Sequence, residues 1–365
     1  MILSSEIPVF KRMRGMIRHA GASLKNIVFV ILFVFAVPVS GFTIVPSGHL
    51  ATSVKFNQSY FDFSRYNLHA SGLIELAPNV HAEVGLDYQP SEPLAPIAWI
   101  DYSFLNAFRI EAGRFPIPFG AFNELLNPST NNLVSTPEIC TDAVPTPWLD
   151  WGARLQWMQT ISKNETFSAS FYICNGLGYG TDLRTSRQMT DNNNSNAVGA
   201  RITLVSSKAG EFGASGYFGA RDNADSLSLG LFGLDAFTKL WLIELRSEYV
   251  AGLLSFPKGA FDAIVVGVDH LADQQGDGYQ SWTCGAYLEA AFKVSDFIVP
   301  AIRADILGYE DLNSKTYISR QRLSVGTACY PVDPLVLKFE FGIVNDKNEQ
   351  GIKLEPLNLQ LGVSF

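Results

Sequence analysis

Six charged residues of the chain lie singly between apolar neighbours, as side chains do on one face of a β-strand. Arg109, for example, lies between Phe108 and Ile110. Because successive side chains of a strand point to opposite faces, each charge shares its face with the residues two positions away. The set comprises Asp101, Arg109, Glu111, Asp150, Arg154 and Arg201. Fixed charges of both signs on one surface create an electric field that orients ions and polar solutes.

The other polar residues do not have the spacing of an enzyme or metal site. The sequence has no G-x-S-x-G pattern and no H-E-x-x-H pattern. The pair Asp269-His270 is expected by chance, and the stretch "DQQGDG" at 273–278 lacks the regular ligand spacing of a calcium loop. The sequence therefore predicts neither catalysis nor a bound cofactor or metal.

Segments of about ten alternating residues recur from His49 to the end of the chain. In "LDWGARLQW", 149–157, apolar residues alternate with Asp, Gly, Arg and Gln. The same period-two pattern appears in "VHAEVGLDY" at 80–88 and "LVLKFEFGI" at 335–343. This period is typical of strands with one apolar and one polar face. A soluble sandwich and a membrane barrel both produce it, because each hides one face from water.

The connections between these segments favour a membrane barrel. Short turns alternate with longer loops, as they do in bacterial outer-membrane barrels. The short turns are expected at 77–79, 106–107, 161–164, 206–210, 237–239, 294–297 and 331–334. The alternation predicts an all-β, closed antiparallel barrel of 16 strands, with both ends of the wall on the periplasmic side. Residues 261–270 are apolar and could lie over the barrel mouth, or could add wall strands to give 18.

The N-terminal residues resemble an export signal. Five basic residues precede the apolar run 27–37, which is shorter than the roughly 20 residues of a membrane-spanning helix. Val39 and Gly41 are small enough for a cleavage site, so we expect a signal peptide at 1–41 and a barrel domain at 42–365. Met13 or Met16 is an alternative start, and an uncleaved anchor is the alternative to cleavage. The formal net charge of −8 argues against nucleic acid as a partner.

The chain ends in "LNLQLGVSF", which alternates perfectly and stops at Phe365. Leu357, Leu359, Leu361 and Val363 share the apolar face with Phe365. Alternation with a terminal aromatic residue resembles the C-terminal signal that the outer-membrane assembly machinery reads. The sequence thus predicts insertion into the outer membrane of a Gram-negative bacterium, with lipid around the wall.

Three stretches resemble phosphate-selective porin O/P-like proteins. These are "RIEAGRFPIPFGAFNE" at 109–124, "GAYLEAAFKVSDFIVPAIRADIL" at 285–307, and "YPVDPLVLKFEFG" with the final strand. The resemblance implies a homotrimer whose third external loop, residues 116–148, folds into the lumen. That loop carries Glu124, Glu138 and Asp142 and no base. Acids on the loop facing Arg109, Arg154 and Arg201 on the wall would form a constriction with a transverse field.

The resemblance implies a porin: a water-filled channel for passive diffusion of small hydrophilic solutes and ions. The expected lumen carries similar numbers of acids and bases, which favours weak cation preference over selectivity for phosphate. A substrate-selective channel for phosphate, sugar or organic acid is the alternative of the same architecture. A barrel enzyme or a structural surface protein with a closed lumen is the alternative of another class.

Four cysteines add a further question. Cys140 lies in the long loop and Cys174 at the end of a predicted strand, so an oxidising periplasm would permit a disulfide between them. Two free thiols are the other possibility. Cys284 and Cys329 fall near opposite ends of their strands and are not expected to pair.

Overall fold

The computed structural model describes residues 43–57, 60–89, 92–124, 130–178, 183, 186–188, 191, 193–224, 226–255, 280–311, 316–346 and 351–364. The predicted signal peptide at 1–41, the apolar segment 261–270 and Phe365 lie outside these ranges. Among the described residues, no helix is long and apolar enough to cross a bilayer.

The strands form one closed antiparallel barrel in which neighbours along the chain are neighbours in the wall. The first eight are β1 (Thr43–Asn57), β2 (Tyr60–Ala77), β3 (Val80–Gln89), β4 (Glu92–Phe104), β5 (Phe108–Pro116), β6 (Leu149–Ser162), β7 (Glu165–Cys174) and β8 (Ala197–Ser206). The next seven are β9 (Gly210–Ala220), β10 (Ser228–Leu240), β11 (Ile243–Ser255), β12 (Gln280–Phe292), β13 (Ile298–Asp311), β14 (Thr316–Val332) and β15 (Leu335–Asp346).

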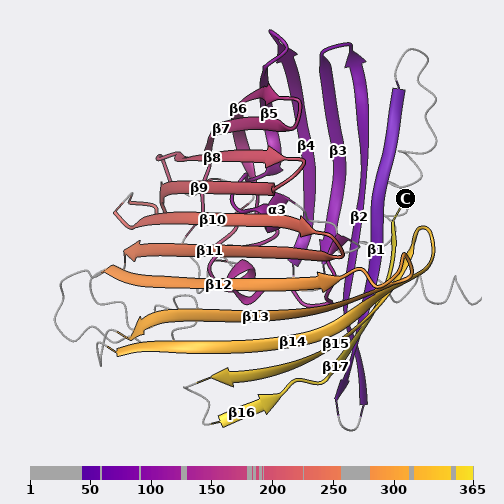
Figure 1. Ribbon diagram of the computed structural model, residues 1–365. Coiled ribbons are helices and arrows are strands. Elements are labelled where there is room, and N and C mark those ends of the chain that lie inside the picture. The colour runs from indigo at the N-terminus through magenta and orange to yellow at the C-terminus, as the bar shows by residue number, and fades with distance from the viewer. Residues whose placement is uncertain are drawn as a thin grey trace, which may run out of the picture.

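The last wall strand is built in two pieces. β16 (Gly351–Leu354) and β17 (Leu357–Ser364) both pair with β15 and share one position in the wall. β17 also pairs with β1, which closes the barrel and leaves no free edge. Figure 1 shows the indigo β1 beside the yellow C-terminal strands. The 16-stranded closed barrel predicted from the sequence is confirmed.

The two faces of the wall differ as the alternation predicts. On β15, Phe339 and Phe341 are exposed on the outside, whereas Lys338 and Glu340 between them are buried inside. On β17, Leu357 and Leu361 point outward and Asn358 and Gln360 inward. Apolar groups exposed all round the outside suit a wall surrounded by lipid rather than water.

All the short turns lie at one end of the barrel, but one of them is not where the sequence analysis predicts it. The turn predicted at 237–239 falls at 241–242, because Thr238, Lys239 and Leu240 continue the alternation of β10. Across this hairpin Lys239 Nζ lies 3.0 Å from Glu244 Oε1.

The connection between β5 and β6 turns into the barrel, as predicted. We call residues 117–148 the inner loop; it carries the short helices α3 (Ala121–Glu124) and α4 (Glu138–Asp142). Figure 1 shows α3 behind the strands of the wall, on their inner side. Phe119, Ile139 and Trp148 of the loop pack in an apolar cluster with Tyr217 of β9 and Leu231 of β10. The loop therefore fills part of the interior with its own hydrophobic core.

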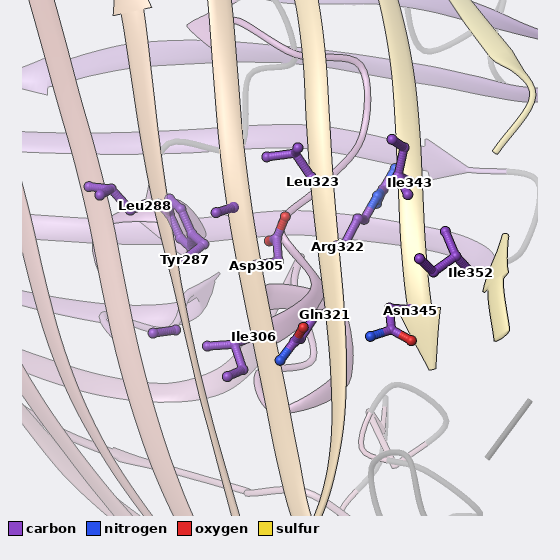
Figure 2. Close-up of a pocket in the computed structure, with 12 residues that line it drawn as sticks. Tyr287, Leu288, Asp305, Ile306, Gln321, Arg322, Leu323, Ile343, Asn345 and Ile352 are labelled. Atoms are coloured by element: carbon purple, nitrogen blue, oxygen red, sulfur yellow. The ribbon is translucent and has the colours of Figure 1, made fainter. Parts of the chain in front are cut away.

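The outer face carries a depression over β12–β16, with a volume of about 620 Å³ (Figure 2). Small side chains at Ala286 and Ala304 line the depression beside the larger Leu288, Ile306 and Leu323. Asp305 and Arg322 alternate with these residues along the strands, and both side chains make their ion pairs inside the barrel. The depression belongs to the apolar outer face and does not suit a hydrophilic solute.

Candidate functional site

The structure places all six wall charges selected from the sequence on the inner face. Arg109 of β5 and Arg201 of β8 even belong to one row of register partners, through Gln156 of β6 and Ser170 of β7. The row continues to Ser215 of β9. This arrangement follows from the strict alternation of β5–β9, which keeps every second residue on the inside.

A basic cluster occupies the inner faces of β3–β6, and we define it as His81, Asp101, Arg109, Glu111 and Arg154. Arg109 Nη2 donates to Asp101 Oδ2 at 2.9 Å and to Glu111 Oε2 at 3.1 Å. Arg154 Nη2 reaches the same Glu111 oxygen at 2.7 Å. His81 Nδ1 lies 3.2 Å from Asp101 Oδ1. The two carboxylates are buried behind the arginines, so the cluster has a formal charge of zero but presents its guanidinium groups to the interior.

An acidic cluster surrounds Arg201 on the neighbouring strands. Asp235 of β10 binds the guanidinium through two oxygens, at 2.5 and 3.0 Å. Glu124 of the inner loop lies 3.0 Å from Arg201 Nε, and Glu211 of β9 lies 3.7 Å from Nη2. Three carboxylates around one buried arginine leave an excess of negative charge. The side chains of Glu124 and Glu211 are each 37% exposed, so this charge faces the interior.

Asp150 has a different environment from the other wall charges. Its carboxylate accepts hydrogen bonds from the backbone N–H of Trp151 at 2.8 Å and of Gly176 at 2.7 Å. Gly176 lies at the start of the connection that follows β7. Leu177 and Leu183 of that connection are buried in the same apolar cluster as Trp148. Asp150 thus fastens that connection over the base of the inner loop.

The two other acids of the inner loop face a strand that was not in the predicted set. Glu138 Oε2 lies 3.2 Å from Arg320 Nε, and Asp142 Oδ2 lies 3.8 Å from Arg320 Nη1. Arg320 belongs to β14. In the order of strands around the wall, β14 lies on the opposite side of the barrel from β5 and β6. The expectation that all three loop acids face Arg109, Arg154 and Arg201 is therefore wrong, because only Glu124 does so. The period-two alternation predicts Arg320 and Arg322 on the inner face, but it does not show that the loop acids face Arg320.

A buried arginine holds the inner loop against the wall, and sequence reasoning did not assign it this role. Arg303 of β13 donates to Ser135 O at 2.8 Å and to Ser135 Oγ at 2.7 Å. Its Nε donates to Asp305 Oδ2 at 2.9 Å. Ser135 N in turn donates to Glu340 Oε2 at 2.6 Å, and Asn132 Nδ2 donates to Glu289 Oε1 at 2.9 Å. A charged network on β12–β15 thus fixes the position of the loop.

The cysteines are free thiols, and Cys140 and Cys174 are both buried in the apolar cluster. The possible disulfide between them is therefore not formed in this structure. Burial raises the pKa of the Cys140 thiol well above its usual range. Within the described ranges, no three His, Cys, Asp or Glu side chains are grouped as metal ligands.

Glu138 makes the docking of the inner loop depend on pH. Burial raises the pKa of this carboxyl from 4.5 to about 7, against the opposing effect of the Arg320 guanidinium. The docked state therefore binds a proton that the undocked state releases between pH 4.5 and 7. We expect docking to be strongest below this window and to weaken as pH rises through it, by at most about 3 kcal/mol.

The measurement is the urea midpoint of the micelle-bound barrel at pH 5 and pH 8, for the wild type and for Glu138→Gln. The variant, which has no proton to lose, is expected to show a smaller decrease. Equal decreases in the two proteins would contradict the assignment to Glu138.

No family model matches the sequence. An uncharacterized protein of Aquifex aeolicus is 30% identical over 119 residues, which are 32% of this chain and 26% of the relative. The chain thus spans about a quarter of the length of that relative.

Several solved structures share the fold. The outer membrane channel DcaP of Acinetobacter baumannii superposes with a TM-score of 0.57 at 12% identity, covering 90% of this chain and 99% of that one. The anion-selective porin from Comamonas acidovorans gives 0.55 at 10% identity, covering 89% and 100%. OmpT of Vibrio cholerae with loop L8 deleted, an outer membrane protein, gives 0.58 at 9% identity, covering 89% and 99%. At these identities the similarity establishes the fold, which is that of a porin-like barrel.

Proposed function

We propose that this protein is a porin, a water-filled channel through which small hydrophilic solutes and ions diffuse passively across the outer membrane of a Gram-negative bacterium. The observation that carries the proposal is the charged inner face of a closed barrel, narrowed by the inner loop and enclosed by an apolar outer face. Channels and porins among the solved structures of the same fold support it.

The proposal includes an orientation and an assembly route. The short turns face the periplasm and the inner loop enters from outside, after export directed by a signal peptide at 1–41. The alternating strand that ends at Phe365 is the segment read by the assembly machinery. A homotrimer is part of the proposal, and one structure of the same fold, in-vitro folded OmpT of Vibrio cholerae, is described as a trimer.

The constriction is formed by charges that the inner loop and the wall bring together. Its proposed members are Asp101, Arg109, Glu111, Glu124, Glu138, Asp142, Asp150, Arg154 and Arg201. Of these, Glu138 and Asp142 face Arg320, and Asp150 binds the connection after β7. Partly exposed acids at Glu124 and Glu211 and the partly exposed Arg109 give the passage two signs of charge. The field across the passage orients polar solutes. The mixture of signs favours general diffusion with weak cation preference over the phosphate selectivity that the O/P-like resemblance suggests.

A planar bilayer recording tests the function. The mature chain is refolded in detergent, inserted into the bilayer, and examined in a KCl gradient for discrete current steps and for the sign of the reversal potential. Steps with a small reversal potential of cationic sign are the expected result. An anionic potential with phosphate block would favour the selective alternative, and an absence of steps from folded protein would contradict a channel.

Neutralising the exposed acids is expected to change ion selectivity. The double variant Glu124→Gln and Glu211→Gln removes two negative charges beside Arg201, while Asp235 still pairs with that arginine. We expect the reversal potential to move toward the anionic side, because the interior becomes more positive. The control is Glu165→Gln, which removes a charge at an exposed short turn. Equal reversal potentials in the wild type and the double variant would exclude these acids from the ion path.

A further inference from the structure

The two arginines of the basic cluster have donors that the protein leaves unused. Their described hydrogen bonds all start from Nη2, and Arg109 and Arg154 converge on the single oxygen Glu111 Oε2. In the part of the chain that the structure describes, Nε of each arginine is buried and has no hydrogen-bond partner. A guanidinium has five N–H donors; the buried Nε cannot reach a solute, so the available donors are those of the Nη groups, and no described hydrogen bond starts from Nη1 of either arginine.

The exposed side chains of the basic cluster are its bases, and the buried ones are its carboxylates. The side chains of Arg109 and Arg154 are 34% and 15% exposed, whereas those of Asp101 and Glu111 are 2% exposed. A solute inside the barrel therefore meets the bases before the acids. His81 Nδ1 donates to the Asp101 carboxylate, so Nε2 of the neutral ring is an acceptor and the two arginines alone supply the donors of the cluster.

Aromatic rings hold the two guanidinium groups in place. The Arg109 guanidinium carbon lies 5.1 Å from the centre of the Trp99 ring, and that of Arg154 lies 5.4 Å from the centre of the Phe115 ring. Contacts of this kind, together with the shared Glu111 oxygen, fix the planes of two side chains that are otherwise long and flexible. The donors are thus organised before any ligand arrives, which lowers the entropy cost of binding.

We propose that Arg109 and Arg154 form a binding subsite for the carboxylate group of small organic solutes. The inference rests on the proposed function, since the ligand reaches the cluster through the channel. A planar carboxylate matches the planar donor edge of a guanidinium and accepts two parallel hydrogen bonds. The solute class is therefore small monocarboxylates, including those whose other groups are polar or neutral.

The two buried acids decide between carboxylate and phosphate. Asp101 and Glu111 lie directly behind the arginines and already neutralise much of their charge. The electrostatic repulsion from these two side-chain carboxylates is stronger for a doubly charged phosphate than for a solute with a single carboxylate group. The cluster thus favours monocarboxylates, in contrast to a run of bases without competing acids.

The test uses acetate as the probe and uncharged acetamide, of nearly the same shape, as its comparison. Acetate added to a channel in KCl is expected to cause concentration-dependent partial block, with at least tenfold less effect from acetamide and a weaker effect from phosphate. The variant Arg109→Lys with Arg154→Lys keeps both positive charges beside the buried acids but loses the planar forks, so the acetate effect is expected to fall about tenfold. Lys208→Gln, at an exposed turn, is the matched control and should behave as the wild type.

Saturation-transfer NMR on the micelle-bound protein reads acetate contact without any current. Acetate contact in a protein that gives no current steps contradicts the channel but supports the subsite. Current steps without acetate contact or block overturn the subsite and leave the channel intact. Equal effects of acetate and acetamide, or stronger block by phosphate than by acetate, also overturn it, and neither result requires a variant to fold.

Discussion

Replacing Arg303 by methionine is expected to lower the free energy of unfolding of the barrel by about 3–5 kcal/mol, the usual cost of leaving buried charges without their partner. Arg303 is almost fully buried, and its ion pairs with Asp305 and Glu289 lie at 2.9 and 3.7 Å. Methionine keeps most of the volume and removes the charge. The measurement is the urea midpoint of the micelle-bound variant, converted with a common slope.

The same variant is expected to release the inner loop. Ser135 loses the two hydrogen bonds that Arg303 donates at 2.7 and 2.8 Å, so the loop is held by fewer contacts on β13. Single-channel records should show larger current noise and a higher mean conductance than the wild type. Lys208→Met, at an exposed turn, serves as the control and should change stability by less than about 0.5 kcal/mol. If the Arg303→Met barrel is as stable as the wild type and its current noise and conductance are the same, the network does not hold the loop.

Gly120→Ala is expected to displace the start of the inner loop. Gly120 has a φ of 71°, in the left-handed region, where alanine costs about 1 kcal/mol more than glycine. A Cβ at this position would also collide with Glu248 Oε1. The Glu248 carboxylate has little room to move, because the residue is 3% exposed and is packed between the wall and the inner loop, where its Oε2 accepts a hydrogen bond from Phe122 N. We expect a loss of about 1–3 kcal/mol in the free energy of unfolding, with altered conductance.

Gly216→Ala is the matched control for this substitution. Gly216 lies in β9, next to the Ser215 that accepts the hydrogen bond from Gly120 N at 3.1 Å. A Cβ at Gly216 would meet no atom within 4 Å, so the same chemical change should be close to neutral there. Similar urea midpoints for the two variants would contradict the proposed role of Gly120.

The strands of the wall could be predicted from the sequence because their pattern depends only on residues that are close together in the chain. The identity of residues two positions apart decides which side of a strand faces lipid, and Arg154 or Lys338 can be assigned to the inside from their neighbours alone. The turn at 241–242 was missed for a local reason as well. Trp241 adopts a φ of 56°, although a β-turn of this kind usually has Asn or Gly there.

The interior could not be predicted because it depends on which residues of distant strands meet the loop. Ser135 contacts Arg303 and Glu340, which lie far along the chain, and no period or motif relates these positions. The sequence therefore indicated a loop with acids and a wall with arginines, but not the pairs they form. Glu138 and Asp142 belong with Arg320, and this pairing depends on how far the loop reaches across the barrel.

The pairing of β1 with β17 has a consequence for how the molecule forms. His49 is the register partner of Ser364, and Phe56 that of Leu357, so the wall is completed by residues from the two ends of the described chain. Every hairpin between them can form from nearby residues, yet the sheet keeps two unpaired edges until this last pairing. The closing step joins the most distant segments and bears the largest loop-closure entropy. Until then the chain is an open sheet with exposed edges, which are the parts most in need of protection from other chains during assembly.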